Sequence, residues 1–169
     1  MKKSIYTLTC LLSLSIAAAP SCCTPSAPSM QEKAPITTVE RTFAMIKPDA
    51  VNNGSTGAII DLIEKNGFRI INMKKLTFNT KQAEAFYAEH KERPFFADLV
   101  RFITSGPAIV LELEKENAIA DWRTLIGTTD PAQANMGTIR KMFAESKSYN
   151  AVHGSDSPAA AKREIGFFF

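Results

Sequence analysis

Strand-like and helix-like segments alternate from residue 38 to the C-terminus, and this alternation limits the fold more than any other feature of the sequence. Segments of strand type, bounded by Pro, Gly or polar residues, occupy 41–47, 68–76, 107–113 and a short stretch at 151–152. Helical spacing or a helix-starting Pro marks 57–65, 80–90, 94–103, 117–125 and 157–165. The order β-α-β-α-α-β-α-β-α predicts an α+β sandwich with helices over a mostly antiparallel sheet.

Single residues predict where these elements begin and end. Thr80 is expected to cap the helix that follows it, and Pro94 is expected at the first position of the next helix. His153 is expected directly after the last strand, where the chain turns after Gly154 into the N-terminus of the final helix. The free N–H groups and the positive dipole end of that helix would favour a nearby anion.

Length and charge narrow the class of protein. The 169 residues suffice for one ordinary domain, and 45% hydrophobic with 22% charged residues is typical of a globular chain. The formal net charge of +3 includes Lys2 and Lys3, so residues 30–169 carry 20 − 2 = 18 basic against 17 acidic residues. This balance predicts no sequence-specific nucleic-acid binding, and any anion site must be a local cluster of cations.

The first 37 residues differ in composition from the rest and are expected to form a separate segment, followed by one domain over 38–169. Lys2-Lys3 and the apolar run over 5–19 are typical of a bacterial export signal, and the run is short for a membrane span of ~20 residues. Cys22 would then be a candidate for lipid attachment, and 24–35 a linker rich in Ser, Pro and Ala. The alternative is that the protein begins at Met30.

Few residues of the domain can support metal or thiol chemistry. All three cysteines lie in the first 23 residues, and His90 and His153 are the only histidines. This excludes a disulfide framework and a thiolate metal site in the domain and argues against a zinc site. Taken singly, each histidine is more often a packed or capping residue than a catalytic one.

Several other side chains are candidates for binding phosphates or a flat ring. Phe95 and Leu99 share one helix face, apart from the apolar face formed by 96, 100 and 103, so they suit either a nucleobase or another subunit. Arg123, Arg140 and Lys47 lie near loops or strand ends, where each alone would ordinarily be a solvated surface charge. Neither glycine-rich phosphate motif, GxxxxGK[ST] or GxGxxG, is present, so side chains would have to hold any nucleotide.

Five blocks in a fixed order give the sequence a specific resemblance from about Glu40 to Phe169. They are RTFAMIKPDAV over 41–51, HKERPFF over 90–96, SGP over 105–107, GTIR over 137–140 and NAVHGSDS over 150–157. In these blocks the sequence closely resembles the nucleoside diphosphate kinase family. The resemblance implies a ferredoxin-like βαββαβ core, with a four-stranded antiparallel sheet and extra helices.

The resemblance also implies a reaction and a role for each matching residue. His153 would take the γ-phosphoryl group of ATP and pass it to a nucleoside diphosphate, in a ping-pong reaction through a phosphohistidine. Glu164 would orient His153 with support from Ser155, and Phe95 would stack on the base beside Leu99. The remaining positions would hold the sugar and the phosphates with Mg²⁺, or lie close to them: Lys47, Asn150, Arg123, Thr129, Arg140, Tyr87 and His90.

Further expectations follow for partners and compartment. The resemblance implies ATP and nucleoside diphosphates as substrates, Mg²⁺ held mainly by their phosphates, and a homo-oligomer, either a tetramer or a hexamer. Asn135-Met136 departs from the family pattern in a loop used for subunit contacts. A phosphoryl shuttle needs a nucleoside triphosphate pool, which favours the cytoplasm, whereas residues 1–22 favour an exported or lipid-anchored protein. A catalytically weak binding protein on the same fold is the second functional hypothesis.

Overall fold

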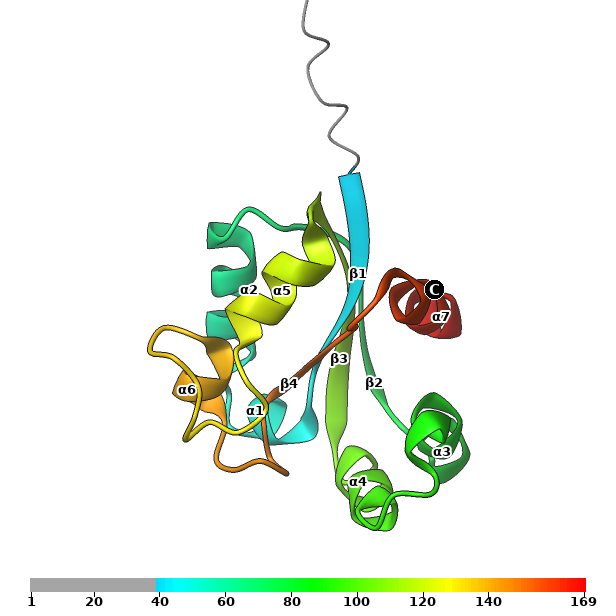
Figure 1. Cartoon of the computed structure of the whole chain (residues 1–169). Coiled ribbons are helices and arrows are strands. Elements are labelled where there is room, and N and C mark those ends of the chain that lie inside the picture. The colour runs from blue at the N-terminus through cyan, green and yellow to red at the C-terminus, as the bar shows by residue number, and fades with distance from the viewer. Residues whose placement is uncertain (1–38) are drawn as a thin grey trace, which may run out of the picture. The chain divides into compact units, whose positions relative to one another are not determined.

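The computed structural model describes residues 39–169, which form four strands, seven α-helices and one 3-10 turn (Figure 1). The strands are β1 (Val39–Ile46), β2 (Arg69–Thr77), β3 (Pro107–Glu116) and β4 (Val152–Gly154). The helices are α1 (Pro48–Asn52), α2 (Thr56–Lys65), α3 (Thr80–Phe86), α4 (Phe96–Ile103), α5 (Ala118–Ile126), α6 (Ile139–Phe143) and α7 (Pro158–Phe168), with the 3-10 turn at Ala88–His90.

The four strands form one sheet in the order β2-β3-β1-β4. Each neighbouring pair is antiparallel, and β4 places His153 opposite Met45 of the central strand β1. In this order the helices between β1 and β2, and those between β3 and β4, connect strands that are separated by a third strand. The arrangement confirms the predicted α+β class and the ferredoxin-like core. The short β4 lies at one edge of the sheet and carries His153.

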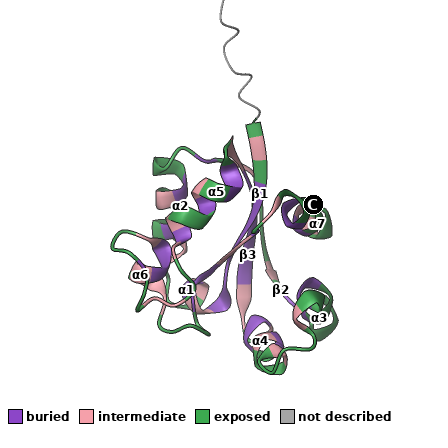
Figure 2. Ribbon diagram, in the orientation of Figure 1, coloured by how far each residue is buried: buried purple, intermediate pink, exposed green. Residues whose placement is uncertain are grey.

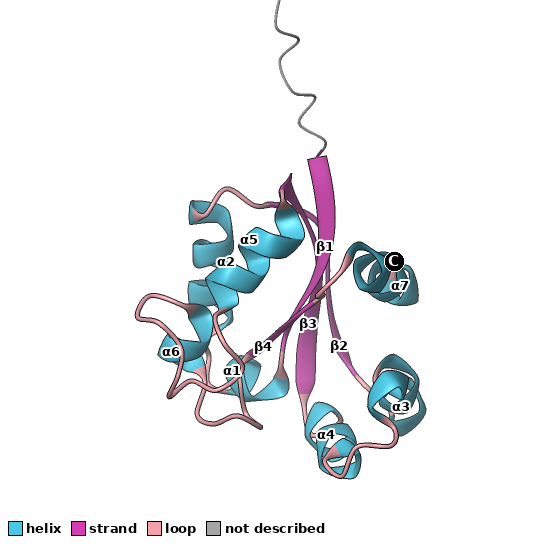
Figure 3. Ribbon diagram, in the orientation of Figure 1, coloured by secondary structure: helices cyan, strands magenta, loops and turns pink. Residues whose placement is uncertain are grey.

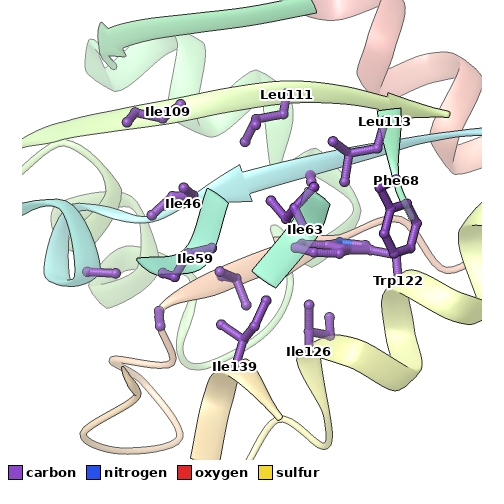
Figure 4. Packing of buried hydrophobic residues seen from close by; sticks show 14 of the residues in the cluster. Ile46, Ile59, Ile63, Phe68, Ile109, Leu111, Leu113, Trp122, Ile126 and Ile139 are labelled. Atoms are coloured by element: carbon purple, nitrogen blue, oxygen red, sulfur yellow. The ribbon is translucent and has the colours of Figure 1, made fainter. Parts of the chain in front are cut away.

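Helices cover both faces of the sheet, as Figures 1 and 3 show. Successive side chains of β1 point to opposite faces, so Ala44 and Ile46 pack against α2, α5 and α6, whereas Phe43 and Met45 pack against α3, α4 and α7. Figure 4 shows the first of these cores, in which Trp122 of α5 lies beside Phe68. Figure 2 shows the buried side of each helix turned toward the sheet.

Local signals account for the clearest element boundaries. Helix α2 ends in a Schellman motif, because Gly67 adopts φ 79° and the N–H groups of Gly67 and Phe68 donate to Glu64 and Ile63. At the start of α7, the Ser157 side chain accepts from the N–H of Ala160. The Ser157 cap determines where α7 begins, and α7 carries Glu164 back toward His153 on the sheet.

Several predicted boundaries are wrong. Asn79, not Thr80, caps α3 through a reciprocal capping box with Gln82, and α3 ends at Phe86 because the chain tightens into the 3-10 turn. Helix α4 begins two residues after Pro94. The five-residue helices α1 and α6 were not predicted, since neither is long enough to show a helical period.

The expected position of His153 also needs correction. His153 lies inside β4, and a loop separates the strand from α7, which begins at Pro158. The N–H of Ala160 at the N-terminus of α7 is bonded to Ser157. The part of α7 that contacts His153 is Glu164, in the body of the helix.

Within residues 39–169, no helix is long and apolar enough to cross a membrane. The predictions for the export signal, the lipid attachment at Cys22 and the linker fall in 1–37, outside the described residues.

Candidate active site

His153 and Glu164 form a hydrogen-bonded pair at the junction of β4 and α7. The Nε2 atom of His153 lies 3.0 Å from Oε2 of Glu164, and the Ser155 hydroxyl donates to the same oxygen at 2.7 Å. Glu164 is almost fully buried, whereas the His153 side chain keeps about 20% of its surface exposed. A carboxylate acceptor at Nε2 requires a proton on that nitrogen, which leaves the lone pair of the neutral ring on Nδ1.

The charge of Glu164 is stabilised by these neighbours. Burial alone would raise the pKa of Glu164, but the hydrogen bonds from His153 and Ser155 and the nearby Arg163 outweigh burial and lower it. Glu164 therefore stays an acceptor at neutral pH, and it holds the His153 ring in one orientation.

Aromatic rings and a backbone contact restrict the histidine further. The rings of Phe43, Phe86 and Tyr87 lie 5.9, 5.5 and 6.1 Å from the His153 ring, centre to centre. On the other face of the sheet, the indole N–H of Trp122 donates to the His153 carbonyl at 3.2 Å. Both the ring and the backbone of His153 are thus held in place by buried groups.

Two cations, Lys47 and Arg140, lie near the beginning of β4. The Lys47 ammonium donates to Oδ1 of Asn150 at 2.7 Å, and the Arg140 guanidinium donates to the carbonyls of Gly127 and Val152. Lys47 and Arg140 are only 6% and 8% exposed, so the interpretation of each as a solvated surface charge is wrong. Arg123 is the exposed member of the group.

The pKa values of the two buried cations are lowered, first by burial and then by neighbouring positive charge. Burial and the nearby Arg140 lower the pKa of Lys47 to about 8. Burial and the nearby Arg123 lower the pKa of Arg140 to about 10. The Nε atom of Arg140 is also buried without a hydrogen-bond partner. Lys47 and Arg140 are buried cations, and Arg140 is repelled by both Lys47 and the exposed Arg123. The three form the local cluster of cations that an anion site in a domain of near-neutral charge requires.

A row of rings leads from His153 to the surface. Tyr87 lies beside His153, His90 stacks near Tyr87 with 6.2 Å between ring centres, and Phe95 follows 5.8 Å from His90. Phe95 is 52% exposed, whereas Leu99 packs partly against the core, so the free apolar face is narrower than predicted. Burial and nearby Glu164 raise the pKa of Tyr87, whose hydroxyl is buried without a partner.

The structure therefore brings together most of the predicted residues. His153, Glu164, Ser155 and Tyr87 form one group, and Lys47, Asn150 and Arg140 form another. Thr129 lies exposed in the loop between α5 and α6, and its contact with phosphates stays a prediction.

Sequence reasoning missed the residues that hold the site together. Trp122 and Phe86 were not considered as neighbours of His153, and Asp49, within the KPD motif, was given no role. Period and spacing identify Phe86 only as a core residue. Nothing in the sequence connects Trp122 to a carbonyl 31 positions away.

The donor set bears on how Mg²⁺ would be held. Among residues 39–169, no three His, Cys, Asp or Glu side chains lie close enough together to hold a metal ion. Mg²⁺ commonly binds phosphate oxygens together with water and only one or two carboxylates. A metal ion held by nucleotide phosphates would need no such cluster of side chains.

Gly154 gives a direct test of the contact between Trp122 and the strand. A Cβ atom at this position would lie 2.3 Å from Nε1 of Trp122, so Gly154→Ala must displace the indole that donates to His153. We expect unfolding free energy to fall by about 1–3 kcal/mol in a denaturant titration, together with a loss of activity. Gly166→Ala is the control, because no atom lies within 4 Å of its added Cβ. Equal stability of the two variants would contradict the role of Trp122.

Comparison with known proteins agrees with this fold and with the resemblance in sequence. Residues 40–169 match the sequence model of the family described as Nucleoside diphosphate kinase. A nucleoside diphosphate kinase of Geobacter sp. (strain M21) is 58% identical over 131 residues, covering 78% of this chain and 96% of the relative. One of Chlorobium limicola is 56% identical over 131 residues, covering 78% and 94%.

Solved structures give the same result. The nucleoside diphosphate kinase of Aquifex aeolicus matches with a TM-score of 0.77 and 44% identity, covering 78% of this chain and 96% of the solved chain. A halophilic nucleoside diphosphate kinase from Halobacterium salinarum, in complex with CDP, matches with a TM-score of 0.76 and 40% identity, covering 78% and 88%. The match of family, relatives and fold over the whole described domain confirms the resemblance, and the chain, an enzyme of the phosphotransferase class, belongs to the nucleoside diphosphate kinase family.

Proposed function

We propose that the protein transfers the γ-phosphoryl group of ATP to nucleoside diphosphates in a ping-pong reaction, with His153 as the phosphorylated carrier. The observation that carries this proposal is the hydrogen bond between Nε2 of His153 and Glu164, supported by Ser155. It fixes the tautomer in which Nδ1 is the nucleophile, and no hydrogen bond to Nδ1 is present among residues 39–169.

Each half of the reaction exchanges one bond for another. The Nδ1 lone pair attacks the γ-phosphorus, an N–P bond forms, and the bond to the ADP oxygen breaks with its electrons leaving on ADP. The Nε2 proton stays on the ring, where Glu164 stabilises the developing positive charge. A terminal phosphate oxygen of the second diphosphate then attacks phosphorus, the N–P bond breaks, and His153 returns to its neutral form.

Stabilisation of charge is the task that we assign to the cations. Phosphoryl transfer depends mainly on positioning and on compensation of negative charge. Lys47, Arg140 and Arg123 supply fixed positive charge, and Asn150 holds Lys47 and meets the sugar hydroxyl. Thr129 would add a hydroxyl from the loop, and Tyr87 and His90 would border the phosphates. Mg²⁺ is proposed to arrive on the nucleotide, where it neutralises phosphate oxygens.

Phe95 supplies the surface on which the base would stack. Its ring is half exposed at the end of the row that starts at His153, with Leu99 one helical turn further along. Stacking on one ring without hydrogen bonds to the base edges tolerates many bases, because every base has a π-face. The Halobacterium relative was solved with CDP, which supports a nucleoside diphosphate as one substrate.

We infer that the enzyme assembles with copies of itself, as a tetramer or a hexamer. Strand β2 has nine residues, lies at one edge of the sheet and pairs only with β3 among residues 39–169. An open edge of this length can pair with another strand, and Met73 on it is 53% exposed. Light scattering on the purified protein is expected to give a mass of four or six chains. A single-chain mass would contradict the proposal.

We also propose that residues 38–169 are the kinase domain and that 1–37 precede it as a distinct segment. The family match begins at residue 40, one residue after β1 begins. The reaction favours the cytoplasm, where nucleoside triphosphates are available. Mass spectrometry of the native protein would distinguish a start at Met1, a start at Met30 and a lipidated Cys22.

The decisive experiment is transfer of label. The protein is incubated with ATP labelled on the γ-phosphate, and the product is tested for acid-labile and alkali-stable phosphate. The label is expected on the protein in the absence of any diphosphate, and it should move to GDP, CDP or UDP when one is added. Absence of label on wild-type protein would overturn the reaction proposed for His153 and favour a catalytically weak binding protein.

A further inference from the structure

Ala151 holds a backbone conformation that alanine rarely adopts. It is one of two non-glycine residues with positive φ among residues 39–169, at φ 63°, and it is fully buried. In this region the Cβ atom crowds the backbone, and alanine has no polar side chain to compensate, unlike the asparagine at the other such position. Contacts from elsewhere in the fold must therefore hold Ala151.

Those contacts come from the beginning of α1, on both sides of the residue. Oδ2 of Asp49 accepts from the Ala151 N–H at 2.9 Å, and the Lys47 N–H donates to the Ala151 carbonyl at 2.8 Å. The turn is closed by the Val152 N–H, which donates to the Asn150 carbonyl at 2.7 Å. Asp49 is the only side chain among these partners, so it is the one contact that a substitution can remove.

The groups on either side of the turn are those that the reaction uses. Asn150 precedes it and accepts from the Lys47 ammonium, while the carbonyl of Val152 accepts from Arg140. His153 is the next residue. A return of Ala151 to negative φ would rotate the peptide groups on both sides and misalign all of these contacts together.

We propose that Asp49 is a positioning residue for phosphoryl transfer, whose carboxylate holds the Ala151 turn and so aligns Asn150, Lys47 and His153. This inference depends on the function proposed above. A second observation agrees with it. Oδ1 of Asp49 is buried without a hydrogen-bond partner, which costs desolvation energy. An acidic residue that served only to stabilise the N-terminus of α1 could do so in solvent, without that cost.

The charge of Asp49 adds to this role. The charged groups that act on the Lys47 ammonium are Arg140 on α6, which lowers its pKa, and Asp49 on α1, which raises it. Asp49 thus favours the protonated form of the lysine beside which phosphates are proposed to bind. Asp49→Asn keeps an acceptor for the Ala151 N–H but removes this charge, which separates the two effects.

The test compares single-turnover labelling of His153 by γ-labelled ATP in four variants that keep the wild-type circular dichroism spectrum. Asp49→Ala is expected to slow labelling about 10- to 100-fold, the typical loss when a group that orients a reactive residue is removed. The double variant Asp49→Ala/Ala151→Gly should recover most of the rate, because glycine adopts positive φ without steric cost. Asp49→Asn should label within a few-fold of wild type at pH 7, with the alkaline limb of its pH profile moved to lower pH.

Asp61→Ala is the matched control, and its labelling rate should not change. This exposed aspartate pairs with Lys65 on the same helix and with no other charged group of residues 39–169. A purely structural role would lower the melting temperature of Asp49→Ala without rescue of the rate by Ala151→Gly, and this result would overturn the inference. If Asp49→Ala does not fold, the double variant and the pH profile of Asp49→Asn decide in the same way. Loss of labelling in wild type would instead overturn the proposed function.

Discussion

Replacement of His153 by alanine is expected to abolish phosphoenzyme formation and to lower kcat/KM by about four orders of magnitude or more, the scale of loss when a covalent nucleophile is removed. The reason is geometric as well as chemical. Glu164 directs Nδ1 of His153, and no other nitrogen nucleophile lies against Glu164 within residues 39–169. The measurement is the incorporation of label from γ-labelled ATP, with and without an added diphosphate.

His90→Ala is the control for this experiment. His90 lies in the 3-10 turn, two ring contacts away from His153 through Tyr87, and does not bond to Glu164. It should still accept label. Label on His153→Ala would show that the carrier has been assigned to the wrong residue, whereas slower labelling of His90→Ala would agree with its proposed place beside the phosphates.

Replacement of Lys47 by methionine is expected to lower kcat/KM by about 10²–10³-fold while leaving the protein as stable as wild type or more stable. Loss of one preorganised charge at a reacting phosphate has an effect of this order. Stability should respond in the opposite direction because the buried ammonium is costly. Its pKa of about 8, against 10.5 for an ordinary lysine, corresponds to a cost of about 3 kcal/mol. Loss of the Asn150 hydrogen bond offsets about 1 kcal/mol of that gain.

The stability difference should also depend on pH with a definite sign. Below pH 8 both the folded and unfolded chains carry the proton, so the cost of the buried charge is fully present. Between about pH 8 and 10.5 the folded protein loses the proton first, and wild type gains stability relative to Lys47→Met. Urea titrations of both proteins at pH 7 and pH 10 should show the difference shrinking. Lys162→Met, on the exposed side of α7, should show neither effect.

A melting temperature of Lys47→Met well below that of wild type would contradict this account. It would mean that the lysine is retained for packing and not for charge. Lost activity with retained stability is expected where a residue is kept for its role in the site although it lowers the stability of the fold.

Residues near in sequence were the most predictable part of the structure. The helices over 57–65 and 117–125 and the strand over 41–47 lie within one or two residues of α2, α5 and β1, because period and punctuation are local signals. The predicted start of α3 was wrong because Asn79 and Thr80 are both suitable caps. Helices α1 and α6 were missed because they are too short to show a helical period.

The burial of charged groups could not be predicted locally. Lys47 and Arg140 each suggested a solvated cation when considered alone. Lys47 is buried against Asn150, which is 103 positions away in the sequence, and Arg140 bonds to one carbonyl in the loop after α5 and one in β4. A cation that is costly to bury alone is tolerated when distant parts of the chain supply acceptors, and the sequence does not indicate which parts will meet.

Residue patterns along the chain predict its alternation of strands and helices in an α+β order, and the motifs identify His153 and the residues expected around it. How these residues act on one another became visible in the folded chain: Glu164 holds Nε2, Trp122 holds the His153 carbonyl, and Asp49 holds the turn at Ala151. The physical reason is that hydrophobic period and turn residues act within one element. Hydrogen-bond direction, desolvation and repulsion between charges are properties of groups that folding alone brings together.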